Sequence, residues 1–203
     1  MRTLRWVGLL LVALLVGAFL HYVLPKRAVV YVTGVENRIV SPDEVRGFRS
    51  LGETTTDAQG RAVSDVFFIN TIQRSGGPLV FRNEDTGFGF PFYFKFDSAN
   101  LQAEAQDAIS ATAAGSGDPR WVIMRYYGWR VPFLSMFPNA VSLELAPSRD
   151  VRLIPWFNIV LLTLLIAAVW AVAARVRRWS RRRRERVATG WETPGPTRRG
   201  WFR

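Results

Sequence analysis

The side chains best suited to binding chemistry gather between positions 126 and 139. They are Tyr126, Tyr127, Trp129 and Arg130, followed by Asn139. A guanidinium among aromatic rings can stack on a ring or pair with a carboxylate. Asn139 follows a proline, where an asparagine side chain commonly hydrogen-bonds the backbone of a turn. We interpret this cluster as a corner that specifies the fold, and a peptide or glycan contact site is the functional alternative.

Acid–base chemistry would have to come from the carboxylates Glu84, Asp85 and Asp97. The first two precede Thr86 and Gly87, a composition typical of a turn. The stretch NEDTG matches only part of the alternating pattern of a calcium-binding loop. We therefore expect structural roles for all three. A carboxylate-dependent envelope hydrolase is the alternative, and it requires two carboxylates converging in a cleft, about 5–9 Å apart.

Several other chemistries are excluded by composition. The chain has no cysteine, so disulfides, thiolate metal sites and cysteine nucleophiles are impossible. It has one histidine, His21, which rules out zinc sites built on two histidines. His21 also lies in an apolar run, so the soluble part cannot hold a Ser-His-Asp triad. The sequence predicts no catalytic residue, no metal ligand and no cofactor.

Two uncharged apolar runs must position these residues. They cover residues 6–24 and 154–174, which are 19 and 21 residues long. A helix of about 19 residues rises roughly 28 Å, close to the thickness of the hydrocarbon core of a bilayer. We expect both to be transmembrane helices. A cleaved signal peptide is the alternative for the first run, but bulky residues stand where a small-x-small cleavage site would lie.

Charge predicts the orientation of the two spans. The tail, residues 175–203, has 11 basic and 2 acidic residues, whereas residues 28–153 have 12 basic and 14 acidic ones. Basic flanks stay in the cytoplasm, so both termini, including residues 1–5, are expected inside and residues 28–153 in the periplasm of a bacterial inner membrane. Eight arginines lie directly after the second run: Arg175, Arg177, Arg178, Arg181, Arg182, Arg183, Arg184 and Arg186.

This position favours contact of the arginines with anionic lipid headgroups over binding of nucleic acid. We expect most of residues 175–203 to be disordered. Small residues spaced four apart, Ala13 and Gly17 in one run and Ala167 and Ala171 in the other, suggest close helix packing, either within the chain or in a homo-oligomer.

The segment between the runs predicts a small mainly-β domain with one helix. Strands are expected near residues 28–33, 64–72, 79–82, 121–129 and 140–146, with a turn at 73–78 and a helix from Asp97 or Ser98 to about Ala113. Five or so strands with one helix favour an OB-like barrel. The fold class is therefore an α+β membrane protein with two transmembrane helices flanking this domain.

Phenylalanines alternate along residues 88–96. Period-two spacing predicts that one face of this strip is buried, so we expect most of its members in the core. Those near Pro91 could instead be exposed to the membrane surface or to a partner.

Several segments carry a resemblance to a known family. They are VFFI, VFRNEDTGFGFP, YFKFDSANLQAEA, YYGWRVPFLSMFPNAVS and IPWFNI. With the two apolar runs, they resemble an uncharacterised family of two-span bacterial inner-membrane proteins, known as a domain of unknown function. The resemblance covers nearly the whole chain except the arginine tail, and residues 126–141 are its most specific part. It implies the two-span architecture and no particular activity.

These observations together predict a non-catalytic accessory protein. Both ends of the domain enter the membrane within a few residues, so another membrane or envelope protein is the expected partner. A periplasmic ligand sensor is a further alternative, although residues 175–203 offer no folded domain to carry a signal.

Overall fold

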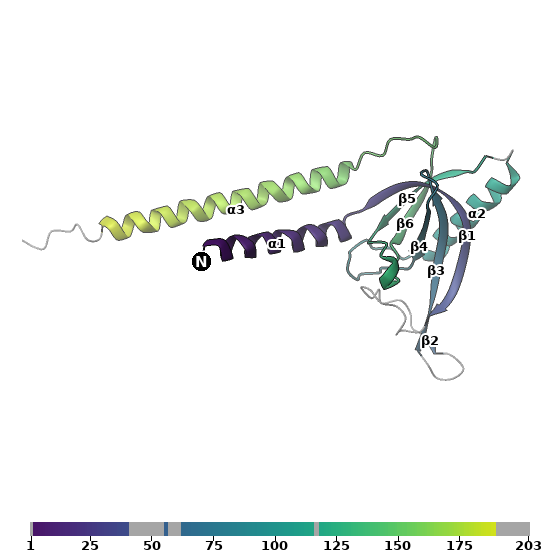
Figure 1. Ribbon diagram of the computed structural model, residues 1–203, viewed down its shortest axis with the longest axis horizontal. Helices are drawn as coiled ribbons and strands as arrows, with labels where there is room; N and C mark the ends of the chain where they lie inside the picture. Colours follow the sequence, from purple (N-terminus) through teal and green to yellow (C-terminus); the bar gives the residue numbers. More distant parts are fainter. Residues whose placement is uncertain (1, 41–54, 57–61, 116–117, 190–203) are drawn as a thin grey trace, which may run out of the picture. The chain divides into compact units, whose positions relative to one another are not determined.

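A computed structural model describes residues 2–40, 55–56, 62–115 and 118–189 (Figure 1). Expected elements falling on other residues lie outside this description. The chain divides into two compact units, Met1–Pro155 and Trp156–Arg203. The helices and strands are α1 (Arg2–Val23), β1 (Lys26–Val40), β2 (Thr55–Thr56), β3 (Ala62–Gln73), β4 (Pro78–Asn83), α2 (Ser98–Ala114), β5 (Trp121–Tyr127), the 3-10 helix η1 (Pro132–Leu134), β6 (Asn139–Leu145) and α3 (Trp156–Thr189).

Five strands close into a barrel. Their order is β1-β5-β6-β4-β3, and β3 pairs with β1 to complete the ring, while the short β2 pairs with the start of β3. Only β4 and β6 run parallel, and α2 lies between β4 and β5 in the chain. This is the strand order of an OB-like barrel. The expected α+β class is confirmed, with two long apolar helices flanking a small barrel.

The length of β1 makes this closure possible. Its first part pairs with β5 and its second part with β3, with a register shift between Val32 and Gly34. A bulge of this kind bends a strand and increases its twist, so one strand can face two neighbours.

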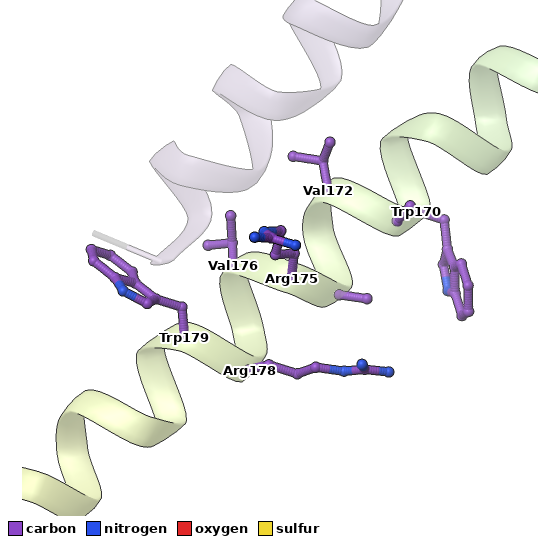
Figure 2. A pocket seen from close by; sticks show the side chains of 8 residues that line it. Trp170, Val172, Arg175, Val176, Arg178 and Trp179 are labelled. Atoms are coloured by element: carbon purple, nitrogen blue, oxygen red, sulfur yellow. The ribbon is translucent and has the colours of Figure 1, made fainter.

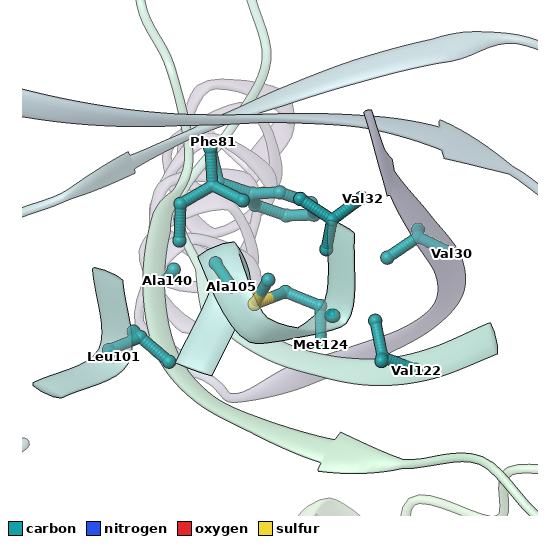
Figure 3. Packing of buried hydrophobic residues seen from close by; sticks show 10 residues of the cluster. Val30, Val32, Phe81, Leu101, Ala105, Val122, Met124 and Ala140 are labelled. Atoms are coloured by element: carbon teal, nitrogen blue, oxygen red, sulfur yellow. The ribbon is translucent and has the colours of Figure 1, made fainter. Parts of the chain in front are cut away.

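Alternation along the strands fills the barrel (Figure 3). Val122 and Met124 on β5 and Phe81 on β4 are fully buried. The helix α2 adds Leu101, Ala105 and Ala108, which lie on one face because they are four and three residues apart. Burial of this mixed cluster is the main force holding the domain together.

The local connections follow the expected turn chemistry, with one exception. The β3–β4 hairpin closes through a bond from Gln73 N to Gly77 O of 2.9 Å, and Gly76 has a positive φ of 88°. The start of α2 differs from expectation, because Asp97 at its N-cap position makes no capping hydrogen bond. Asp85 Oδ1 instead accepts the Ser98 N–H at 2.8 Å. A carboxylate from the preceding loop thus caps the helix.

Both apolar helices are long enough and apolar enough to span a membrane, over Thr3–Val23 and Trp156–Arg181. Their helical bounds differ from the predicted 6–24 and 154–174. The larger difference is in α3, which continues to Thr189 although residues 175–203 were expected to be mostly disordered. Arginine is a good helix former, and no glycine or proline interrupts the sequence from Trp156 to Thr189.

Figure 2 shows the region of α3 where its composition changes. Trp170, Val172 and Val176 give way there to arginines, with Trp179 beside them. Tryptophan next to basic residues is typical of the end of a membrane span.

Candidate functional site

The last turn of α1 is built into the barrel. β1 begins at Lys26, only three positions after the helix ends at Val23. Gly128 N donates to Tyr22 O at 2.9 Å, and the Tyr93 hydroxyl donates to Val23 O at 2.5 Å. The last carbonyls of a helix have no partner within the helix. Here the barrel supplies two of the missing donors, which fixes the helix end to the domain.

Aromatic packing reinforces this junction. The Tyr22 ring makes T-shaped contacts with the rings of Tyr127 and Trp129, whose centroids lie 6.3 Å and 5.4 Å from its own. Tyr93 stacks on Tyr127 with centroids 4.6 Å apart. Trp129 Nε1 donates to His21 Nδ1 at 2.7 Å, which adds a polar contact to the junction. Burial raises the pKa of Tyr127 to about 12 and also raises the pKa of Tyr93.

Five residues were expected to form one cluster, and the four from Tyr126 to Arg130 divide among three places. Tyr127 and Trp129 hold α1, whereas the Tyr126 ring packs on Phe81, with centroids 5.0 Å apart. Arg130 lies over the Phe137 ring at 4.1 Å and donates to Met136 O at 3.1 Å. The guanidinium therefore stacks on an aromatic ring, which is one of the two interactions expected for it from the sequence.

Asn139 is buried and holds the end of β4. Its Oδ1 accepts Glu84 N at 3.0 Å, and its Nδ2 donates to Glu84 O and to the Tyr127 hydroxyl, both at 3.0 Å. One amide side chain thus pairs with backbone, as expected from its place after Pro138. It also links the barrel interior to the ring that contacts α1.

A buried lysine is the polar centre of the domain, and sequence reasoning missed it. Lys95 is only 7% exposed; its Nζ donates to Asn83 Oδ1 and, at 2.8 Å, to Ala140 O. Asn83 in turn donates to Ser98 O and Gln102 Oε1. Burial lowers the pKa of Lys95 to about 8, although nearby carboxylates partly oppose this shift. The available signal was a single lysine among alternating phenylalanines.

Each of the three carboxylates has a structural partner. Glu84 Oε2 lies 3.1 Å from Arg82 Nε, within ion-pair distance, but the pair lacks the alignment of a hydrogen bond. Asp85 caps α2, and Asp97 accepts from Asn100 Nδ2 at 2.8 Å. The expectation of structural roles is consistent with these contacts.

The aromatic strip turns outward, so the expectation that most of it is core was wrong. Phe88 is 80% exposed and Phe92 66% exposed, and none of the five phenylalanines is buried. The segment is an irregular loop whose base is closed by bonds between Thr86 or Gly87 and Lys95. The segment does alternate, but the phenylalanines are on its exposed side: Pro91 and Lys95 are buried and Tyr93 is half-buried.

A shallow pocket of about 330 Å³ lies beside the junction of α1 and the barrel. Its lining includes His21, Trp129 and two cations, Lys26 and Arg130. Lys26 Nζ donates to Gly128 O at 2.9 Å, and burial lowers its pKa. Within the described part of the chain, neither cation lies within ion-pair distance of a carboxylate. The pocket is therefore positively charged.

The arginine cluster lies on α3. The side chains of Arg175, Arg177, Arg178 and Arg181 are exposed. Arg182, Arg183, Arg184 and Arg186 belong to the same helix, but their side chains lie outside the description.

Comparison with known proteins identifies relatives of the whole architecture. A relative from Haemophilus influenzae, described as an uncharacterized protein, is 37% identical over 159 residues, covering 78% of this chain and 83% of the relative. No solved structure matches. The family model described as "Protein of unknown function (DUF1523)" matches residues 1–180. These matches confirm the resemblance to a family of unknown function: the chain belongs to the DUF1523 family.

Proposed function

We propose that this chain is a non-catalytic accessory protein of a bacterial inner membrane. It would hold its β-domain at the membrane surface, where the domain binds and stabilises other membrane or envelope proteins. The observation that carries the proposal is the union of α1 with the barrel through Tyr22, Tyr93 and Trp129. A domain fixed to a span keeps a constant height above the membrane and a constant orientation. Its binding surface is therefore already positioned for a partner in the same membrane.

Charge supports the placement of the domain. The arginines after the second span favour cytoplasmic termini and a periplasmic domain at residues 28–153. They would also contact anionic headgroups, each with about 1 kcal/mol of attraction. The structural partners of Glu84, Asp85 and Asp97 support a role without acid–base catalysis.

Topology can be tested with single cysteines, because the chain has none of its own. Leu145 on the domain and Arg181 on α3 are both exposed. We expect Leu145→Cys to react with a membrane-impermeant maleimide in cells whose outer membrane is permeabilised. Arg181→Cys should react only after lysis. The reverse pattern would overturn the orientation.

The accessory role can be tested by gentle detergent purification from native membranes, with an untagged strain as control. We expect the same membrane or envelope protein to be retained in several detergents and to be cross-linked to this chain in intact cells. Recovery of the chain alone under all of these conditions would remove the support for the accessory role.

A further inference from the structure

The outward phenylalanines form a continuous aromatic strip, Phe88, Phe90, Phe92, Phe94 and Phe96. We propose that this strip inserts into the outer leaflet of the bilayer beside α1 and gives the β-domain a second attachment to the membrane. The inference rests on the proposed membrane anchoring. It addresses an unusual arrangement, in which a lysine occupies the interior while five large apolar rings face outward. A contiguous patch of exposed large apolar side chains marks a site of contact with a partner or a membrane.

Contact with α1 sets the depth of the strip. The Phe90 ring stacks on Phe19 with centroids 5.6 Å apart and an interplanar angle of 15°. Phe19 lies within the candidate span Thr3–Val23, four residues before its end. Four residues of helix rise roughly 6 Å, so if α1 crosses the bilayer, Phe90 lies below the level where the helix leaves it. Interfacial apolar groups insert to a similar depth, about 5–10 Å.

Ring contacts connect the other four phenylalanines to Phe90. Phe90 contacts Phe92, Phe92 contacts Phe94, and both Phe94 and Phe96 contact Phe88, with centroids 5.2–6.3 Å apart. All five rings therefore form one group continuous with the span. A lipid surface fits this group because the bilayer already surrounds Phe19 in the proposed arrangement.

The loop is held in this position from both sides. Its base is closed by bonds from Thr86 N and Gly87 N to Lys95 O, at 3.1 Å and 3.0 Å. Its middle is tied to α1 by the Tyr93 hydroxyl, which donates to Val23 O. The cations Lys26 and Arg130 line the pocket at the same helix end, where they can meet lipid phosphates. A loop ordered in advance loses little further entropy on insertion.

Single-cysteine variants of the full chain test the insertion. Phe92→Cys, Val12→Cys and Leu145→Cys replace exposed residues of the strip, the span and the distant end of β6. Leu145 pairs with Val122 at the far end of β5. Val122 lies five residues before Tyr127 along this strand, which corresponds to roughly 16 Å between the two residues. Each variant is labelled with an environment-sensitive fluorophore and reconstituted in vesicles of phosphatidylethanolamine and phosphatidylglycerol. The thermal unfolding of each labelled chain confirms that it is folded.

We expect the probe at Phe92→Cys to be quenched by a nitroxide on the lipid acyl chain, near the headgroup. We also expect its quenching by aqueous iodide to be several-fold weaker than that of Leu145→Cys. If the Phe92→Cys probe behaves like the Leu145→Cys probe while the Val12→Cys probe is quenched by lipid, the insertion is overturned and the anchoring stands. If the Val12→Cys probe is not quenched by lipid, the proposed membrane anchoring itself fails.

Native membranes supply the remaining arm of the test. A Phe92→Cys residue protected from a water-soluble maleimide in native membranes, but reactive in the pure lipid vesicles, would show that a protein covers the strip. That outcome would also overturn the lipid proposal. Protection in both settings is the result that we expect.

Discussion

Strand β5 and the loop before α2 use the same alternating pattern in opposite ways. In β5 the apolar Val122 and Met124 point into the barrel. In the loop the phenylalanines point outward, Lys95 is buried in the interior and Tyr93 is half-buried against α1. An alternation therefore identifies two faces without saying which one is buried. The partners that each face can find decide that question: the β5 side chains meet the core, whereas Lys95 meets carbonyl oxygens and Tyr93 meets the end of α1.

The largest expected effect tests the strand side of this comparison. Phe81→Ala removes a fully buried ring from the centre of the core. We expect the free energy of unfolding to fall by about 3–5 kcal/mol, because the ring loses its burial and leaves a cavity. Denaturant unfolding in detergent, followed by the near-ultraviolet circular dichroism of the domain, measures this change. A loss below about 1 kcal/mol would mean that the ring is not part of a packed core.

The next effect tests the inward face of the loop through pH. The pKa of Lys95 is lowered from 10.5 to about 8 by burial, so between these values the unfolded chain binds more protons than the folded chain. Stability should therefore rise with pH above about 8, by at most about 1.4 kcal/mol per unit. Below pH 8 the cost of burying the charge is fully present.

The free energy of unfolding, measured from pH 7 to about 9.5, should rise more steeply with pH in the wild-type chain than in Lys95→Met. The tyrosines, which begin to ionise in the unfolded chain within this range, are the same in both chains and do not affect the difference. Lys26, whose pKa burial also lowers, is present in both chains and does not affect the difference. Equal pH dependence in the two chains would contradict the buried position of Lys95.

A smaller effect tests the bond between the loop and α1. Tyr93→Phe keeps the ring that stacks on Tyr127 but removes the hydroxyl that donates to Val23 O. We expect a loss of about 1 kcal/mol in the free energy of unfolding, the usual value for one hydrogen bond. Tyr31→Phe is the matched control, because the Tyr31 ring packs on Trp121 and its hydroxyl makes no hydrogen bond within the described residues. Equal losses in both variants would remove the special role of the Tyr93 hydroxyl.

The smallest effect tests the outward face of the loop. Phe92→Ala removes a ring that is 66% exposed, so unfolding in detergent should change by less than about 0.5 kcal/mol. Phe81→Ala deletes the same ring at a buried position. The difference between the two losses in the free energy of unfolding therefore measures how much burial contributes at each position. A loss comparable with that of Phe81→Ala would show that the strip belongs to the core after all.

Much of the fold could be predicted from the chain alone because its signals are local. β-branched and aromatic stretches gave the strands of the barrel, the Gly-Gly-Pro turn gave the β3–β4 hairpin, and the spacing of Leu101, Ala105 and Ala108 gave the buried face of α2. The apolar runs gave two helices able to span a membrane. The extent of α3 was not predicted: the helix continues through the arginines to Thr189, because arginines extend a helix readily.

The candidate site was only partly predictable. The types of Tyr127, Trp129 and Asn139 indicated a corner that specifies the fold, but their partners Tyr22, Tyr93 and Glu84 are far away in the sequence. The one local sign of Lys95 was its place among alternating phenylalanines, and it was too weak to predict burial, because lysine is almost never found inside a protein without partners. Its acceptors, Asn83 and the Ala140 carbonyl, come from two strands that meet only when the barrel closes.

The sequence by itself determined the two apolar helices, the strands, the excluded chemistries and the charge asymmetry, because these depend on composition and short-range spacing. Only the tertiary structure decided that the last turn of α1 is part of the domain, that Lys95 lies inside and that the phenylalanines of the neighbouring loop lie outside. The physical reason is the same for all three. Each depends on a hydrogen-bond or ring partner at a large separation along the chain, and only closure of the barrel brings those partners together.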